Sequence, residues 1–178
     1  MIRLGRGKWK GHILRPSSKL CRPTSSLLRG AFLDIAGRAL VESAIVWDLC
    51  AGSGAVGLET LSWGASYCVF VDRNPRSTSF IRSFLRDHNA MDDAAVITGS
   101  IREYIKSTDS VPDIVYIDPP YRYSRIYDWA YSIEWNAILS PKGAVFVECG
   151  DESMMKEGWN KRKYGDSYLF WKMMKEVQ

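Results

Sequence analysis

Residues 48–57 read Asp48-Leu49-Cys50-Ala51-Gly52-Ser53-Gly54-Ala55-Val56-Gly57, and they continue an apolar run that begins at Ala44. Glycines allow a backbone to turn tightly and allow a ligand to approach the main chain. A helix that begins directly after such a loop presents unpaired N–H groups to that ligand. The stretch therefore predicts a buried strand, a ligand-binding glycine loop and a helix, in that order.

Short apolar runs alternate with amphipathic segments through the rest of the chain. The expected strands are Ala44–Leu49, Tyr67–Val71, Ala94–Thr98, Asp113–Ile117 and Gly143–Cys149, and the expected helices are Ala55–Trp63, Pro75–Asn89, Ile101–Lys106 and Ile126–Ile138. This alternation is typical of an α/β fold in which helices cover both faces of a mostly parallel sheet. Near the end of the chain, Gly165-Asp166 separates Lys161–Tyr164 from Ser167–Lys172 and predicts a closing antiparallel hairpin.

The first 38 residues are much more basic than the remainder. They contain nine Lys or Arg and one acidic residue, a net charge of +8, so the other 140 residues carry a net −4 within the total of +4. Glycines at positions 5, 7 and 11 predict a hairpin within residues 1–20, and Thr24 or Ser25 is expected to cap a helix. We expect residues 1–40 to form a basic extension packed on a main domain of residues 41–178, the two making a single globular unit.

Clustered cations favour a phosphate-backbone partner, because each neutralised phosphate releases a counterion. The candidate RNA contacts are Arg6, Lys8, Trp9, Lys10, Arg22 and Arg29. A solvated basic arm without a partner is the alternative interpretation.

Other features narrow the class of protein. No apolar run is long enough to span a bilayer, and the basic N-terminus is not followed by the apolar block of a signal peptide. The four cysteines are far apart and the chain has two histidines. We therefore expect a soluble cytoplasmic protein with reduced thiols and without a metal site.

The glycine loop alone does not identify its ligand. Residues 52–57 also match the dinucleotide fingerprint, with Asp72 placed to bind a ribose. The carboxylate of Asp48, however, would repel a pyrophosphate and would suit the ammonium group of a methionine moiety. The pattern favours S-adenosylmethionine, which carries an ammonium and a sulfonium but no phosphate. The candidate cofactor residues are Asp48, Ala51, Gly52, Ser53, Gly54, Asp72 and Arg73.

Ser100 and Ile101 follow the third expected strand and extend this candidate site. Ser100 is expected near the adenine amino group of the cofactor and Ile101 against the adenine ring. A helix N-cap is the alternative role for Ser100.

The stretch Asp118-Pro119-Pro120-Tyr121 leaves the fourth expected strand and is the candidate catalytic site. Ligands of α/β folds bind at the carboxyl ends of the strands, so this stretch is expected beside the glycine loop. The Asp118 carboxylate and the Pro119 carbonyl would accept hydrogen bonds from an exocyclic amine, the prolines would restrict the backbone, and Tyr121 would stack on an unpaired or flipped base. A rigid loop with a surface tyrosine is the structural alternative.

These residues, together with the basic segment Gly7–Gly11, Arg22-Pro23-Thr24 and the closing Lys163–Asp166, resemble the small-subunit ribosomal RNA guanine-N2 methyltransferase family (the RsmD type). The resemblance implies a Rossmann-like seven-stranded sheet of order 3-2-1-4-5-7-6 and methylation of a guanine N2 in 16S ribosomal RNA. It also implies a partly assembled 30S subunit as substrate and a monomeric enzyme. The chain departs from the family pattern at Ser26, Leu27, Gly30 and Ser100.

Three other functions fit parts of the pattern. An N6-adenine methyltransferase acting on RNA or DNA would present a similar exocyclic amine to Asp118. A nucleotide-binding redox protein would use the same glycine loop. A non-catalytic RNA-binding assembly factor would keep the fold and the basic extension.

Overall fold

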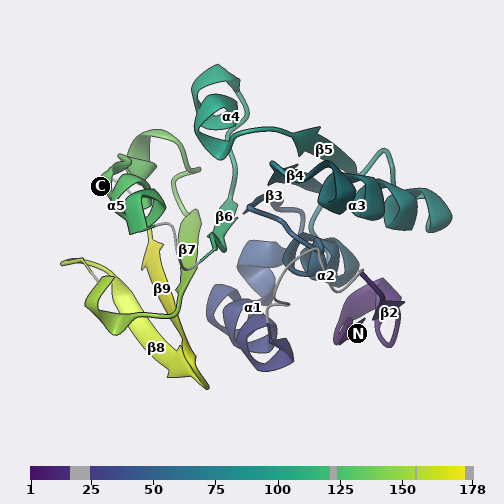
Figure 1. Ribbon diagram of the computed structural model, residues 1–178, viewed down its shortest axis with the longest axis horizontal. Coiled ribbons are helices and arrows are strands. Elements are labelled where there is room, and N and C mark those ends of the chain that lie inside the picture. Colours follow the sequence, from purple (N-terminus) through teal and green to yellow (C-terminus); the bar gives the residue numbers. More distant parts are fainter. Residues whose placement is uncertain (17–24, 121–123, 155, 175–178) are drawn as a thin grey trace.

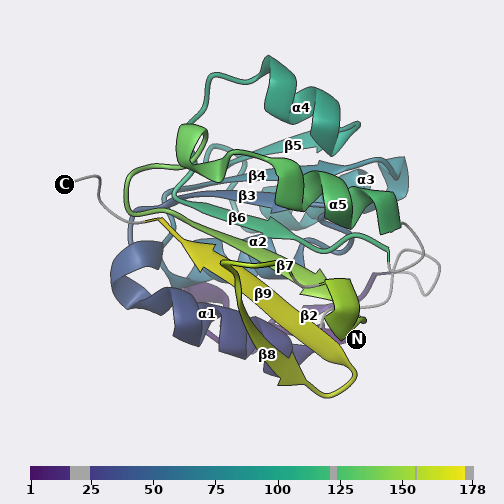
Figure 2. The same cartoon turned by 90° about the vertical axis from the view of Figure 1, so that its left-hand side faces the viewer.

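The computed structural model describes residues 1–16, 25–120, 124–154 and 156–174 of the chain. Its main feature is a seven-stranded sheet, with strands in the order β5-β4-β3-β6-β7-β9-β8. The strands are β3 (Ile45–Leu49), β4 (Tyr67–Asp72), β5 (Ala94–Thr98), β6 (Ile114–Ile117), β7 (Ala144–Cys149), β8 (Asn160–Tyr164) and β9 (Ser167–Met173). Figure 2 shows them in this order, from β5 at the top to β8 at the bottom.

The first five strands of this sheet pair in parallel, and β9 pairs antiparallel with both β7 and β8. When the seven strands are renumbered from β3 as the first, their order reads 3-2-1-4-5-7-6. The sequence-based prediction of a mostly parallel α/β sheet closed by an antiparallel hairpin is therefore confirmed.

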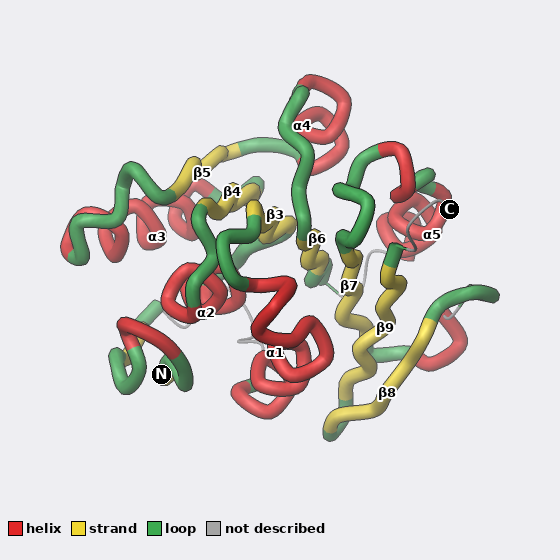
Figure 3. The backbone as a smooth tube through the Cα atoms, turned by 180° about the vertical axis from the view of Figure 1, so that it is seen from behind, coloured by secondary structure: helices red, strands yellow, loops and turns green. Residues whose placement is uncertain are grey.

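Helices cover both faces of the sheet, as Figures 1 and 3 show from opposite sides. One face carries α1 (Ser26–Val41), α2 (Ala55–Trp63) and α3 (Pro75–Asp87), and the other carries α4 (Ile101–Ser107) and α5 (Ser124–Ser132). Each face has its own hydrophobic core: Phe32, Phe70 and Tyr116 belong to the first, while Trp47, Ile117 and Tyr127 belong to the second.

Two helix boundaries follow from local chemistry. Helix α1 begins after Ser25, whose hydroxyl accepts a hydrogen bond from the Leu28 N–H at 3.1 Å, as an N-cap residue should. Helix α5 ends at Ser132, six residues before the predicted end at Ile138. A 3-10 helix at Trp135–Ala137 follows it, and the buried Trp135 indole donates to the Ala130 carbonyl at 2.9 Å. The prediction of one continuous helix was wrong because the indole N–H bonds back to α5.

The basic extension begins with a two-stranded hairpin. Strand β1 (Ile2–Arg3) pairs antiparallel with β2 (Ile13–Leu14), and the 3-10 helix η1 (Gly7–Trp9) lies between them. Figure 1 shows this hairpin in purple beside α2, and Ile2, Leu4, Trp9 and Leu14 join the core of the α1–α3 face. We refer to residues 1–16 as the head.

Candidate active site

The glycine loop connects β3 to α2 in a left-handed backbone conformation. Cys50, Gly52 and Gly54 have φ angles of 65°, 55° and 72°. At Gly54, the N-cap of α2, an added Cβ would lie 2.7 Å from the Ile81 side chain, so a side chain is excluded by space as well as by φ. The loop is closed by the Gly54 N–H, which donates to the Ala51 carbonyl at 2.7 Å. The backbone of this loop is therefore held in one tight turn.

Two predicted cofactor residues, Asp48 and Asp72, stabilise this loop through backbone hydrogen bonds. The buried Asp48 carboxylate accepts from the Gly57 N–H at 2.9 Å, in the first turn of α2. Asp72 accepts from the Gly52 N–H and from the Asn74 N–H, each at 2.7 Å. Both acids thus hold the loop in place, and their contacts with a cofactor stay predictions.

Burial and neighbouring carboxylates shift the pKa values of two groups in this part of the molecule. The pKa of Asp48 is raised to about 7, chiefly by burial and in smaller part by the negative charge of Asp72, while the Gly57 hydrogen bond lowers it. The pKa of the Cys50 thiol is also raised, first by burial and then by the charges of Asp72, Asp118 and Asp48. Carboxylates from β3, from β4 and from the end of β6, together with the Arg73 guanidinium, therefore lie near Cys50 in the glycine loop. Such a cluster favours a cationic ligand.

The predicted catalytic stretch lies beside the glycine loop. The Asp118 N–H donates to the carbonyl of Leu49, the last residue of β3, at 3.2 Å. Asp118 is half-buried, Pro119 is buried and Pro120 is exposed. Tyr121 lies outside the described residues, so its predicted stacking role stays a prediction.

The hydroxyl of Tyr127 in α5 donates to the Pro119 carbonyl at 3.1 Å. Sequence reasoning assigned that carbonyl to the substrate amine and did not include Tyr127 in the site. The sequence predicted only that Tyr127 lies in a helix, and no motif indicated that its hydroxyl reaches a strand end.

The region predicted to bind adenine begins at α4. Ser100 is the N-cap residue of α4 but makes no side-chain capping bond, and the Arg73 guanidinium donates to its hydroxyl at 3.3 Å. Ile101 is buried in the core that also contains Trp47 and Val69. Arg73 and Ser100 are thus brought together, whereas Ile101 packs into the protein interior, and the cofactor contacts of these residues stay predictions.

Two predicted RNA contacts have a different role in the structure. Arg29 is 2% exposed, and its guanidinium donates to Glu59 at 2.8 Å and to the Arg3 carbonyl at 2.9 Å. Trp9 is 6% exposed and packs edge-on against Phe84. We correct both assignments: a buried side chain with these partners stabilises the fold and does not offer a surface to RNA.

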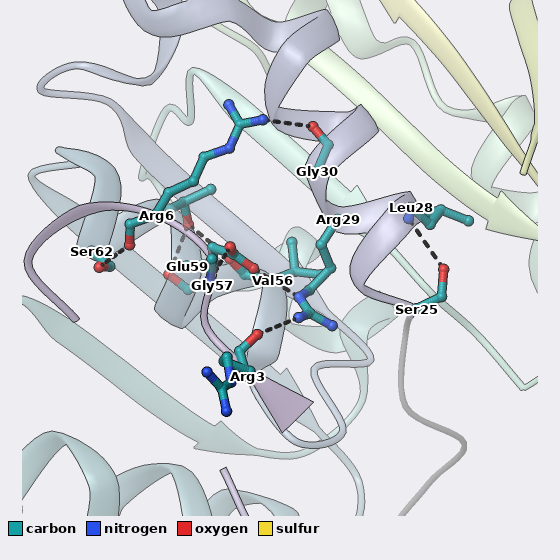
Figure 4. Close-up of polar contacts among 12 residues, drawn as sticks. Arg3, Arg6, Ser25, Leu28, Arg29, Gly30, Val56, Gly57, Glu59 and Ser62 are labelled. Carbon is teal, nitrogen blue, oxygen red and sulfur yellow. Dashed lines mark hydrogen bonds and ion pairs between the residues drawn. The ribbon is translucent and has the colours of Figure 1, made fainter. Parts of the chain in front are cut away.

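Figure 4 shows how α2 holds the head through the same network. The Glu59 carboxylate accepts from the Gly5 N–H at 2.7 Å as well as from Arg29. Ser62, one turn further along α2, donates to the Arg6 carbonyl at 2.6 Å and accepts from the Trp9 N–H at 2.7 Å. The helix that begins at the glycine loop therefore also anchors the head.

The other basic candidates lie nearer the surface. Arg6 pairs with Asp34 at 2.6 Å and lies over the Trp63 ring, and Lys8 pairs with Asp93 at 3.3 Å. Lys10 is exposed, and Arg22 lies outside the described residues. Surface ion pairs of this kind are weak, and the predicted RNA contacts of Arg6 and Lys8 stay predictions.

Two kinds of feature are absent from the described part of the chain. No group of three or more His, Cys, Asp or Glu residues within it is arranged to hold a metal ion. Among the helices described, none combines the length and the apolar character needed to cross a membrane.

Comparison with known proteins identifies the family of this chain and proteins that are similar to it. The family model described as conserved hypothetical protein 95 matches residues 2–171. The chain is 27% identical over 148 residues to ribosomal RNA small subunit methyltransferase D of Escherichia coli K12, a match that covers 83% of this chain and 74% of that protein.

Two solved structures share the fold. The yhhF structure from Escherichia coli has a TM-score of 0.83 at 23% identity, over 98% of each chain. The structure of an RNA methyltransferase from Salinibacter ruber in complex with S-adenosyl-L-homocysteine has a TM-score of 0.67 at 15% identity, over 88% of this chain and 96% of that chain. The resemblance predicted from the sequence is confirmed, and the chain belongs to the family described as conserved hypothetical protein 95.

Proposed function

We propose that this protein is an S-adenosylmethionine-dependent methyltransferase that methylates the exocyclic N2 of a guanine in 16S ribosomal RNA. It acts as a cytoplasmic monomer on a partly assembled small ribosomal subunit. The observation that carries the proposal is the hydrogen bond from Asp118 to Leu49, because it joins the Asp-Pro-Pro stretch to the end of the strand that leads into the glycine loop. This contact supports a cofactor site and an acceptor site that are adjacent.

The electrostatics of the site support S-adenosylmethionine over a nicotinamide dinucleotide. The carboxylates of Asp48, Asp72 and Asp118 all act on Cys50 in the loop, and they would repel a pyrophosphate. They would attract a ligand that carries an ammonium and a sulfonium. The names of the relatives support the same cofactor, since one solved neighbour is an RNA methyltransferase bound to S-adenosyl-L-homocysteine.

In this proposal, catalysis depends mainly on the residues that orient the amine. An exocyclic amine is a poor nucleophile because its lone pair is delocalised into the ring. Hydrogen bonds from its N–H groups to the Asp118 carboxylate and to the Pro119 carbonyl direct the lone pair, and well-oriented reactants gain roughly 7–11 kcal/mol. When bound, the cofactor would supply its sulfonium methyl group to the amine lone pair, and the Asp118 carboxylate would accept the proton that the nitrogen releases.

The choice of RNA and of guanine rests on other features. The head carries exposed cations, among them Lys8 and Lys10, that suit a phosphate backbone. Relatives of this chain are named ribosomal RNA small subunit methyltransferase D, which supports small-subunit RNA as the substrate. The preference for the guanine amine follows from the family resemblance, because the Asp-Pro-Pro stretch can hold either a guanine or an adenine amine.

A transfer assay with tritiated S-adenosylmethionine and small-subunit particles tests the proposal. We expect Asp118→Ala to lower kcat by about 10²–10³-fold, a loss of the size seen when one group that binds a transition state is removed. The matched control is Asp128→Ala on α5, which removes an exposed carboxylate whose partner, Lys156, lies 3.6 Å away. This control variant should turn over as the wild type does.

Binding measurements separate the proposal from its main rivals. Calorimetry should detect S-adenosylmethionine binding to the wild type and, within about tenfold, to Asp118→Ala, which loses one of the carboxylates that attract the cofactor. A protein that binds NAD tightly and S-adenosylmethionine not at all would contradict the proposal, and so would an Asp118→Ala variant with undiminished transfer.

A further inference from the structure

We infer that Tyr127 is a positioning residue for methyl transfer: its hydroxyl fixes the direction of the Pro119 carbonyl that accepts from the substrate amine. The inference rests on the proposed function and adds to it a residue from α5, outside the Asp-Pro-Pro stretch and the glycine loop.

The hydrogen bond between these residues is shielded from water. Tyr127 is 1% exposed, Pro119 is buried, and the hydroxyl donates to the Pro119 carbonyl at 3.1 Å. Water therefore cannot easily take over either partner, and the bond has one defined geometry. A tyrosine hydroxyl has a single proton, so the direction of this donation is set by the Pro119 oxygen.

Tyr127 also contacts the end of the neighbouring strand. Its hydroxyl lies near the Cys149 thiol at the end of β7, and burial raises the pKa of that thiol. Strands β6 and β7 are neighbours in the sheet. One hydroxyl thus spans the carboxyl ends of two adjacent strands.

The acceptor stretch is therefore held from two sides. The Asp118 N–H bonds to the Leu49 carbonyl on the β3 side, and the Pro119 carbonyl bonds to Tyr127 on the α5 side. The Pro119 carbonyl belongs to the peptide bond with Pro120, which has no N–H to hold that peptide in place. The helix contact consequently sets the direction of the Pro119 carbonyl within the site.

A carbonyl oxygen has two lone pairs, and this arrangement assigns one to Tyr127. The other can accept from the amine while Asp118 accepts a second N–H. Without the hydroxyl, the carbonyl keeps its acceptor capacity but loses the bond that directs it. The loss of the hydroxyl therefore disturbs the orientation of the amine in the transition state. It should lower kcat and leave the binding of the cofactor unchanged.

The test is Tyr127→Phe, which removes the hydroxyl and keeps the ring. We expect kcat for methyl transfer to small-subunit particles to fall about fivefold to twentyfold, with KM for S-adenosylmethionine and for the particles within about twofold of the wild type. The matched control is Tyr116→Phe. Tyr116 is buried, and its hydroxyl donates at 3.1 Å to Glu148, so the same atom and a bond of equal length are lost elsewhere.

Thermal unfolding of both variants separates positioning from stability. We expect both to lose stability, but only Tyr127→Phe to lose kcat. Equal kcat in Tyr127→Phe and wild type, or equal losses in the two variants, would overturn the inference while an active wild type keeps the proposed function intact. A wild type that transfers no methyl group would overturn the proposed function first, and this role of Tyr127 with it.

Discussion

At the scale of single residues, Asp48 is the most informative side chain of the site. Its carboxylate is buried, accepts the Gly57 N–H at 2.9 Å, and has a pKa raised to about 7 mainly by burial. Burying a carboxylate without a cation is costly, because the charged form loses its hydration. A cationic ligand near the loop would recover part of this cost, which links the stability of the protein to its cofactor.

The pKa of Asp48 predicts a pH-dependent stability. An unfolded Asp has a pKa of about 3.9. Between that pH and about 7 the folded protein keeps a proton on Asp48 that the unfolded chain has lost, so the free energy of unfolding falls as pH rises. Asp48→Asn removes this effect and keeps an acceptor for Gly57. Calorimetry without ligand measures the Tm of the variant minus the Tm of wild type. We expect this difference to be at least about 3 °C more positive at pH 8 than at pH 5.

The same variant should bind S-adenosylmethionine about tenfold more weakly at pH 8, since a charge that attracts the ligand is missing. A Tm difference that does not change with pH, together with unchanged cofactor affinity, would show that Asp48 is neither the titrating group nor a cofactor determinant.

The sequence indicated some site residues better than others. Asp48, Asp72 and Asp118 end or follow apolar runs, and carboxyl ends of parallel strands meet at one edge, so their proximity was predictable. Arg29 and Trp9 were misassigned because charge and aromaticity do not reveal burial, which here depends on Glu59 and on the packing of the head. Tyr127 was missed because its partner, the Pro119 carbonyl, is a backbone atom on another element.

At the scale of elements, two helix glycines have opposite environments. A Cβ at Gly57 in α2 would lie 2.3 Å from the Phe70 ring and 2.6 Å from the Cys68 sulfur. A Cβ at Gly30 in α1 would meet nothing within 4 Å. Close packing of α2 on β4 therefore requires glycine at position 57, whereas α1 tolerates a side chain at position 30.

Alanine at these two positions should change the free energy of unfolding in opposite directions. Gly57→Ala should lower the free energy of unfolding by about 1–3 kcal/mol through overpacking. Gly30→Ala should raise it by about 0.5–1 kcal/mol, because alanine loses less backbone entropy in a helix. Urea unfolding measures both values, and a shift in the same direction for the two variants would contradict the packing described for α2.

Element positions were largely predictable from periodicity. The predicted helix Ala55–Trp63 coincides with α2, and the predicted strand Ala94–Thr98 coincides with β5. The end of α5 was not predictable, because it depends on the Trp135 indole bonding back to Ala130. Periodicity predicts which face of a helix is apolar. It does not predict where a side-chain hydrogen bond to the backbone ends that helix.

At the scale of the whole molecule, charge is divided between two regions. The first 38 residues carry +8 while the rest of the chain carries −4. Acids of the main sheet gather at the glycine loop, and α2 connects that loop to the basic head through Glu59 and Ser62. This division suits a reaction in which a cationic donor and an anionic RNA bind to different parts of one molecule.

Product identification tests this account most directly. Small-subunit particles from a strain that lacks the protein would be incubated with the purified chain and tritiated S-adenosylmethionine, and the ribosomal RNA would be digested to nucleosides. We expect the label in N2-methylguanosine of 16S ribosomal RNA, and Asp118→Ala should remove it. Label in N6-methyladenosine instead, or no label in RNA at all, would contradict the assignment of this chain as a guanine-N2 methyltransferase.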